Sequence, residues 1–426
     1  MLSSGGGKLA AKFEHLSYLK TTGDKHAVIL DIGSAYTKVG FASEWAPHAI
    51  LPSFVDDWSS GLKGAVVDHG RSPQEQRPIL KKFLYTIYYE HLLVAPKDRR
   101  VVIVESVLTP TAHRRLLASV LFEDFDVPSI LFAPSHLLAT FPLGVSSALV
   151  LDVGYSEAVA IPVFESVTML SCWEASPAAG ARALEERLKA LLLEHGVLRQ
   201  AGGSEQPLKE QPQLLTPQLL EDIKVKGCFA TRLQRGRAIQ ASKDASQLPP
   251  PPPSCQYPLG NGLSLTVPGL AREAAGEASF SFDAAGDDKS AAQLILDVLL
   301  RVPVDLRLPL AGSIFVMGGG AMLPGFLARL KAELEELVQS DYAGKLFVGQ
   351  EEGEERNKSA FKFFPARGCP NYAAWLGGSM FGALEILAPR SVSREEWQSS
   401  GHLPDWCSAD VLDSSEEPAT PSSRRR

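Results

Sequence analysis

Three short apolar runs along the chain each end in a polar or glycine-rich turn. Residues 27–33 read AVILDIG, residues 148–154 read ALVLDVG, and residues 314–320 read IFVMGGG. Continuous apolar runs of this length, bounded by turn residues, are typical of strands buried on both faces. The pattern therefore predicts three buried strands, two of which share one Asp-x-Gly ending.

The turns after these strands suit a phosphate and a cation. An Asp at the carboxyl end of a buried strand can hold a metal ion through water, and glycines let backbone N–H groups close around a phosphate. For one Asp alone, a capped turn is the simpler interpretation. The repeated spacing at Asp31 and Asp152 favours a site. We expect a nucleotide clamped between two related halves.

Strands alternate with helices along most of the chain, which indicates mixed α/β lobes. Apolar spacing predicts helices at 78–93, 110–121, 180–195, 216–241, 291–300, 323–338 and 372–387. Further strands are predicted at 36–42, 100–105, 129–132, 158–163 and 167–171. Residues 52–77, interrupted by Gly, Asp, Ser and Pro, are interpreted as a loop with little core.

Polar and low-complexity stretches suggest where the lobes begin and end. The leader at 1–24 and the tail at 410–426 are predicted to be disordered. Gly- and Pro-rich insertions are expected near 200–215 and 243–256, and the prolines within the second favour a polyproline II spacer over a docking peptide. The predicted lobes are 25–147 with 370–409, and 148–369.

Bulk properties exclude several classes of protein. A chain of 426 residues is long for one core, and its net charge of −7 disfavours a nucleic-acid partner. The five cysteines form no Cys-x-x-Cys pair, which fits reduced thiols better than disulfides or a zinc site. No apolar run approaches the roughly 18 residues of a membrane helix. No hydrophobic signal segment opens the chain, so secretion is not expected.

Six segments, in order, resemble the actin family. The phosphate-loop and adenosine-turn stretches are DIGSAYTKVGFASEWAP, LDVGYSEAVAIPVFES and GGGAMLPGFLARL. The segments RVVIVESVLTPTAHRRLL, EDIKVKGCFA and YAAWLGGSMFGALE extend the likeness over most of residues 26–400. The resemblance implies an α/β actin-like fold, with two related lobes around a cleft that holds ATP or ADP with Mg²⁺ as a structural ligand.

The resemblance also implies a role for individual residues. Asp31 and Asp152 would hold the metal ion through water, and Lys38 would face the β-phosphate. Lys224 would lie near the ribose or base. The remaining expected contacts are the phosphate-binding backbone at Gly33, Ser34, Ala35, Gly154 and Tyr155, and the adenosine contacts Gly318, Gly319 and Met322.

The chain departs from the family where hydrolysis would occur. Actins use a Gln and a His to position the attacking water, and the aligned residues here are Ser135 and Val159. Loss of such groups typically costs on the order of 10²–10⁴ in rate. Tyr155 also replaces an acidic residue and Val225 replaces a Glu. We therefore expect no catalytic residue and slow or absent hydrolysis, with nucleotide binding retained.

A second departure concerns assembly. The span that forms subdomain 2 in actins, with its loop that enters the neighbouring subunit, is much shorter here and keeps no clear hydrophobic finger. A subunit with one usable face ends a filament without extending it. The expected protein is thus a cap that does not polymerise by itself.

Among actins, the chain most resembles the divergent actin-related subunits at the pointed end of dynactin. This likeness implies contacts with the dynactin filament subunits centractin and actin and with the accessory pointed-end subunits, an indirect link to dynein, and a place in the cytoplasm and cytoskeleton. The alternatives are an actin-related subunit of a nuclear chromatin-remodelling complex and, less favoured because of Ser135 and Val159, an active ATPase or sugar kinase of the same superfamily.

Overall fold

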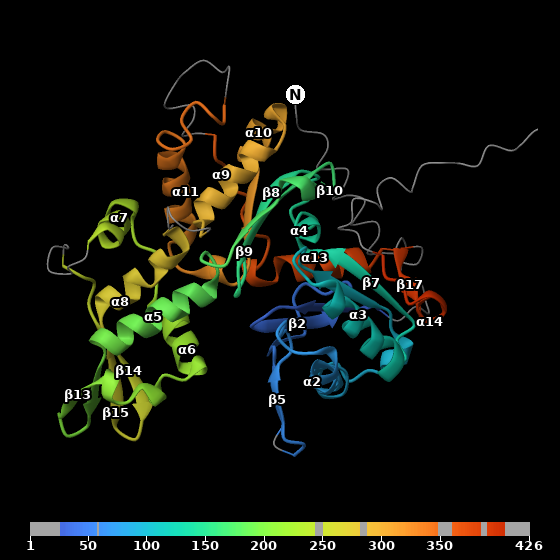
Figure 1. Ribbon diagram of the computed structural model, residues 1–426, viewed down its shortest axis with the longest axis horizontal. Helices are drawn as coiled ribbons and strands as arrows, with labels where there is room; N and C mark the ends of the chain where they lie inside the picture. The colour runs from blue at the N-terminus through green and yellow to red at the C-terminus, as the bar shows by residue number, and fades with distance from the viewer. Residues whose placement is uncertain are drawn as a thin grey trace, which may run out of the picture.

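Two large sheets organise the chain in the computed structural model (Figure 1). The structure describes residues 26–57, 59–242, 250–281, 288–347, 360–384 and 390–404. The predicted leader and tail, and positions 243–249 of the second insertion, lie outside these ranges. Within the described ranges, no helix is both long enough and apolar enough to cross a bilayer.

The first sheet has six strands in the order β17-β7-β6-β1-β2-β3. Strand β1 pairs antiparallel with β2 and parallel with β6, which in turn pairs parallel with β7. The strands are β1 (Val28–Ile32), β2 (Tyr36–Phe41), β3 (Ala49–Pro52), β6 (Val101–Glu105), β7 (Ser129–Pro134) and β17 (Val392–Ser393).

The second sheet repeats the central part of the first. Strand β8 pairs antiparallel with β9 and parallel with β16, in the order β10-β9-β8-β16, and β11 pairs with β9. Both sheets thus place a hairpin beside a parallel strand, as the repeated motif predicts. The strands are β8 (Ala148–Val153), β9 (Ala158–Phe164), β10 (Val167–Thr168), β11 (Glu174–Ser176) and β16 (Ile314–Met317).

Helices pack around each sheet, and a smaller sheet of order β13-β12-β15-β14 extends the second lobe. Beside the first sheet lie α2 (Pro73–Tyr85), α3 (Thr111–Ser119), α4 (Ser135–Leu138), α13 (Ala373–Gly382) and α14 (Arg394–Ser400). The second lobe holds α5 (Ala181–His195), α6 (Pro217–Gly227), α7 (Leu233–Ala241), α8 (Gly269–Ala274), α9 (Ala291–Arg301), α10 (Val304–Ala311) and α11 (Phe326–Leu337). The smaller sheet comprises β12 (Val197–Gln200), β13 (Glu205–Pro207), β14 (Cys255–Gly260) and β15 (Leu263–Val267).

Helices α4 and α13 join the two lobes at the base of the space between the sheets (Figure 1). Trp375 is fully buried there, and its indole N–H donates to the carbonyl of Ile29 at 3.2 Å. Gly377 lies so close to α4 that an added Cβ would be 1.9 Å from the carbonyl oxygen of Leu138. One apolar cluster, with residues of both sheets, surrounds this junction.

The prediction of a loop over residues 52–77 is wrong. A two-stranded hairpin, β4 (Phe54–Asp57) and β5 (Leu62–Ala65), forms there, and Val55 and Val66 are buried in the core of the first lobe. The next helix starts at Pro73 instead of residue 78, because Ser72 and Glu75 form a capping box. The turn of the hairpin includes position 58, which lies outside the described residues.

Tertiary contacts also produce structure that local composition did not predict, and they divide one predicted helix. Within the predicted first insertion, β13 forms and Leu208 is fully buried. The predicted helix at 216–241 is two helices, α6 and α7. They separate because Ala230 donates its backbone N–H to the carbonyl of Pro324 at 2.8 Å instead of continuing a helix. Helices α8, α10 and α14 were not predicted from the sequence.

Candidate functional site

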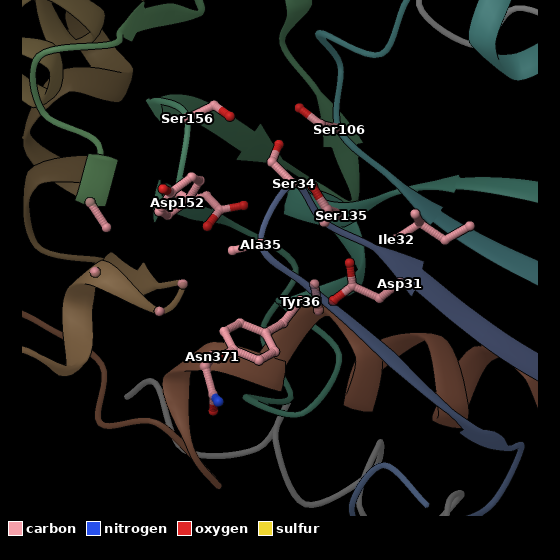
Figure 2. Close-up of a pocket in the computed structure, with 18 of the residues that line it drawn as sticks. Asp31, Ile32, Ser34, Ala35, Tyr36, Ser106, Ser135, Asp152, Ser156 and Asn371 are labelled. Carbon is pink, nitrogen blue, oxygen red and sulfur yellow. The ribbon is translucent and has the colours of Figure 1, made fainter. Parts of the chain in front are cut away.

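A cleft of about 640 Å³ lies between the two large sheets, at the carboxyl ends of β1, β8 and β16 (Figure 2). Open α/β architectures place ligands at this end of their strands. All the residues predicted for the site line this one cleft: Asp31, Gly33, Ser34, Ala35, Lys38, Ser135, Asp152, Gly154, Tyr155, Val159, Lys224, Gly318, Gly319 and Met322.

The two Asp-x-Gly motifs form matching turns. The backbone N–H of Gly33 donates to the carbonyl of Tyr36 at 3.2 Å, and that of Gly154 donates to the carbonyl of Glu157 at 3.0 Å. A Cβ at Gly33 would approach the Tyr36 oxygen to 2.8 Å, so the tight turn requires glycine there. Each turn follows the first strand of its hairpin, β1 or β8.

The two aspartates approach the cleft from opposite lobes, with their carboxyl groups directed into it (Figure 2). Asp31 and Lys38 are register partners on β1 and β2, and Lys38 Nζ lies 3.0 Å from Asp31 Oδ2. Burial raises the pKa of Asp152 to about 6; Lys38 lowers it, while Asp31 and Glu157 raise it further. The site thus concentrates negative charge around one lysine.

The glycines after β16 lie in close contact with Asp152 and Val153 at the end of β8. Gly318 has φ +96°, and an added Cβ would lie 2.5 Å from Asp152 Oδ1. Its N–H donates to the carbonyl of Pro370 at 2.9 Å, which fixes the turn against the first lobe. Gly319 faces open space, and Met322 is half exposed at the cleft.

Two tyrosine–glutamate contacts, absent from the sequence prediction, lie at the same cleft, which is lined by Tyr36, Tyr155 and Glu221. Tyr155 donates its hydroxyl to Glu185 at 3.0 Å, and Lys224 Nζ lies 2.5 Å from the other oxygen of that carboxylate. Burial and Glu185 raise the pKa of Tyr155 to about 12. Tyr36 donates its hydroxyl to Glu221 at 2.7 Å. Tyr36 and Glu221 are 185 residues apart, so local sequence offers no signal for their contact.

Ser135 and Val159 are joined through a histidine that the sequence analysis did not single out. His136 is fully buried, and burial lowers its pKa to about 4, so the ring is neutral at pH 7. Its Nε2 donates to the Val159 carbonyl at 3.2 Å, since a carbonyl only accepts. Nδ1 then accepts from the Ser135 hydroxyl at 3.2 Å. The hydroxyl proton of Ser135 is thereby directed toward His136.

Comparison with known proteins agrees with this architecture. A sequence model of the actin family matches residues 22–408. The chain belongs to the actin family. "Actin-related protein 10" of Dictyostelium discoideum is 26% identical over 442 residues, covering 90% of this chain and 89% of the relative. An "Actin-like protein" of Neurospora crassa is 24% identical over 397 residues, covering 88% of this chain and 95% of the relative.

The two-lobed α/β structure is accordingly an actin-like fold, and its cleft fits a nucleotide with a hard cation. Asp31 and Asp152 offer carboxylate oxygens, which Mg²⁺ prefers, and the two turns offer backbone N–H groups for phosphate. The described residues contain no cluster of three or more His, Cys, Asp or Glu able to hold a metal ion. Such a cation would therefore complete its shell with water or phosphate oxygens.

Proposed function

We propose that this actin-family protein is a non-catalytic structural subunit that caps the pointed end of the dynactin filament and so supports dynein-driven transport along microtubules. The similarity to a protein named Actin-related protein 10, which extends over 90% of the chain, carries the proposal. The expected partners are centractin and actin in the filament and the accessory pointed-end subunits. The expected location is the cytoplasm.

The residues of the cleft support the proposed absence of catalysis. Phosphoryl transfer depends on a positioned water and on charge stabilisation. Val159 has no side-chain polar atom, and the short Ser135 hydroxyl donates to His136. Neither side chain offers the reach or the acid–base chemistry of the Gln and His that actins use. The cleft keeps its glycine turns, carboxylates and lysine, which supports ATP or ADP with Mg²⁺ as a structural ligand.

The short hairpin β4–β5 supports the proposed capping role. In actins the corresponding region carries the loop that enters the next subunit, whereas here only four positions, 58–61, lie between the strand ends Asp57 and Leu62. A heterologous filament grows only when every subunit both offers and accepts a face. Loss of one contact region leaves a subunit that binds a filament end and stops growth there.

Purification of the full chain from cells tests the assignment. We expect centractin and the pointed-end subunits among the co-purifying proteins, and ATP or ADP in the denatured complex by mass spectrometry. Recovery of chromatin-remodelling ATPases without centractin would contradict the assignment and favour the nuclear alternative.

Two assays with purified protein test the mechanism. With Mg²⁺ and ATP, we expect phosphate release at least about 10²-fold slower than for an actin under the same conditions. Added to centractin filaments, the protein should stop growth at one end and form no filaments alone. Actin-like phosphate release, or long filaments of this chain, would disprove the proposed mechanism.

A further inference from the structure

The contact between Tyr36 and Glu221 crosses the cleft from one lobe to the other. Tyr36 is the first residue of β2 in the first sheet, and Glu221 lies on α6 in the second lobe, which faces β2 across the space between the lobes (Figure 1). The phenolic oxygen lies 2.7 Å from Glu221 Oε2. Both residues line the cleft itself.

This hydrogen bond has the properties of a strong one. The acceptor is a carboxylate, and charge-assisted hydrogen bonds stabilise the bonded state more than neutral ones do. Such a bond shifts the equilibrium between the bonded and the open state on the order of tenfold or more. Burial, together with Glu221 and Glu185, raises the pKa of Tyr36, so the phenol stays protonated and remains a donor at physiological pH. The tyrosine therefore does not lose its donor hydrogen near neutral pH.

Both ends of the contact are anchored in their own lobes. On α6, Leu220 and Ile223 are buried in the second-lobe core, and Lys224 forms an ion pair with Glu185 of α5. On the other side, the residue after Tyr36, Thr37, is fully buried and shares a hydrogen bond of 2.8 Å with Ser53. The backbone at each end of the bond is thus held within the packed structure of its own lobe.

Several other described contacts between the lobes lie at the base of the cleft. They include α4 against β8 and β9 and the hydrogen bond from His136 to the Val159 carbonyl. Contacts at a base allow the lobes to rotate about it, whereas a bond across the cleft opposes that rotation. We propose that the Tyr36–Glu221 hydrogen bond is a latch that holds the two lobes together across the cleft when no ligand is bound.

The latch has a consequence for any ligand of the cleft. A molecule that contacts both lobes would enter and leave faster when the lobes are apart, so breaking the bond should speed both steps. This consequence rests on the proposed binding of ATP or ADP, whereas the latch itself does not. The two ideas can therefore fail separately.

Hydrogen–deuterium exchange of the full chain, stripped of nucleotide and divalent cations, tests the latch. Tyr36→Phe keeps the ring and removes the hydroxyl, and Glu221→Gln keeps an acceptor without the charge. Tyr342→Phe is a matched control, because Tyr342 donates to Asp297 at 2.6 Å within the second lobe, away from the cleft. We expect Tyr36→Phe to raise amide exchange about tenfold in residues 33–36 and 217–227, with a smaller rise for Glu221→Gln.

The control and the double variant decide whether the exchange reports on the Tyr36–Glu221 bond. Tyr342→Phe should leave exchange at the cleft unchanged, and a Tyr36→Phe, Glu221→Gln double variant should exchange no faster than Tyr36→Phe alone. Equal exchange at both cleft segments in the wild type and Tyr36→Phe would overturn the latch. Release of a fluorescent ATP analogue tests the consequence separately, and we expect it to be about tenfold faster from Tyr36→Phe than from the wild type. If the wild type does not bind the analogue, that result counts against nucleotide binding and does not change the meaning of the exchange experiment.

Discussion

At the scale of single residues, the properties of the cleft depend on groups that their surroundings hold in one conformation or one protonation state. Backbone geometry fixes Gly318, burial fixes the neutral ring of His136, and hydrogen bonds fix the direction of the Ser135 hydroxyl. Each of these groups acts through close contact with a neighbour. A single substitution therefore separates its contribution from that of the rest of the site.

Replacement of Gly318 should destabilise the protein. Its φ of +96° disfavours any side chain, and a Cβ would press on Asp152 and the carbonyl of Val153. We expect Gly318→Ala to lower the free energy of unfolding by about 2 kcal/mol. The matched control is Gly319→Ala, because Gly319 has helical dihedrals and open space around it. Urea denaturation measures both, and equal losses would contradict this account of the turn.

His136 should make stability depend on pH. Its folded pKa, about 4, lies below the ordinary value of 6.5, so the unfolded chain binds more protons between these values. Stability from this group is complete above pH 6.5 and falls by about 3 kcal/mol as the pH drops through 4. His136→Gln should flatten this part of the profile in denaturation curves at several pH values. The exposed His402→Gln is the control, and parallel profiles for both variants would count against the prediction.

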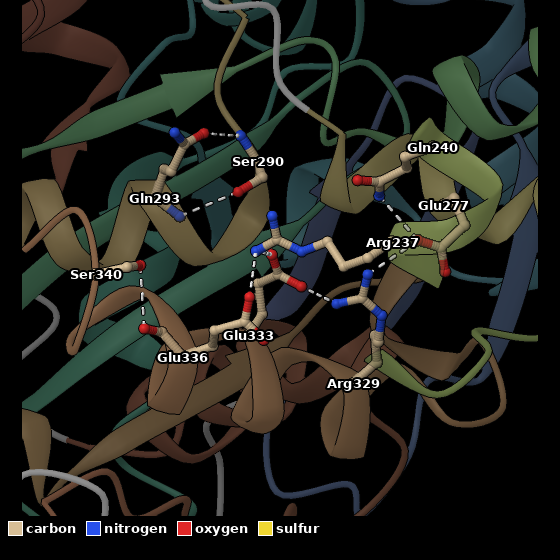
Figure 3. A network of polar contacts seen from close by, with 9 residues as sticks. All are labelled: Arg237, Gln240, Glu277, Ser290, Gln293, Arg329, Glu333, Glu336 and Ser340. Atoms are coloured by element: carbon tan, nitrogen blue, oxygen red, sulfur yellow. Dashed lines mark hydrogen bonds and ion pairs between the residues drawn. The ribbon is translucent and has the colours of Figure 1, made fainter. Parts of the chain in front are cut away.

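At the scale of elements, a buried charge network fixes α7 and α11 beside the segment that carries Glu277 (Figure 3). Arg329 on α11 is 2% exposed; it lies 2.9 Å from Glu277 Oε2 and also pairs with Glu333. Arg237 on α7 pairs with Glu333 as well, and Gln240 donates to Glu277 at 2.9 Å. Burial raises the pKa of Glu277, although Arg329 opposes that shift. Removal of one partner leaves buried charge without compensation.

Loss of Arg329 should therefore be costly. We expect Arg329→Ala to lower the free energy of unfolding by about 3–5 kcal/mol, the usual effect of breaking a buried ion pair. The control is Lys331→Ala on the same helix, where the side chain is half exposed and 3.9 Å from Glu335, so the change should be within about 1 kcal/mol. Denaturant titration distinguishes them, and a small effect at Arg329 would mean that water reaches the network.

At the scale of the whole molecule, repeated local sequence patterns predicted the main strands around the cleft. The elements and contacts that the sequence did not predict depend on residues far apart in the chain. The two Asp-x-Gly motifs and the triple glycine predicted the three strands that meet at the cleft. The hairpin β4–β5 was missed because its short strands contain charged and glycine residues and depend on burial of Val55. Likewise, the glutamates that pair with Tyr36 and Tyr155 were missed because nothing near either tyrosine in sequence indicates them.

Binding of a nucleotide should couple both lobes, because the ligand would touch turns from each. A ligand at about 100 times its dissociation constant adds about 2.7 kcal/mol to the free energy of unfolding. We expect ATP with Mg²⁺ to stabilise the wild type by this amount and EDTA to remove the effect. Lys38→Met should abolish this stabilisation, because the phosphates would then face the carboxylates of Asp31 and Asp152 without the nearby ammonium group of Lys38.

Lys63→Met gives the matched comparison for Lys38. Lys63 also pairs with an aspartate, Asp56, at 2.8 Å, but on the exposed hairpin β4–β5 outside the cleft. Removal of that pair should change stability by less than about 1 kcal/mol and leave the ligand effect intact. If Lys38→Met and Lys63→Met respond equally to ATP with Mg²⁺, the stabilisation arises elsewhere on the surface. That result would contradict the binding of the nucleotide phosphates beside Lys38 in the cleft.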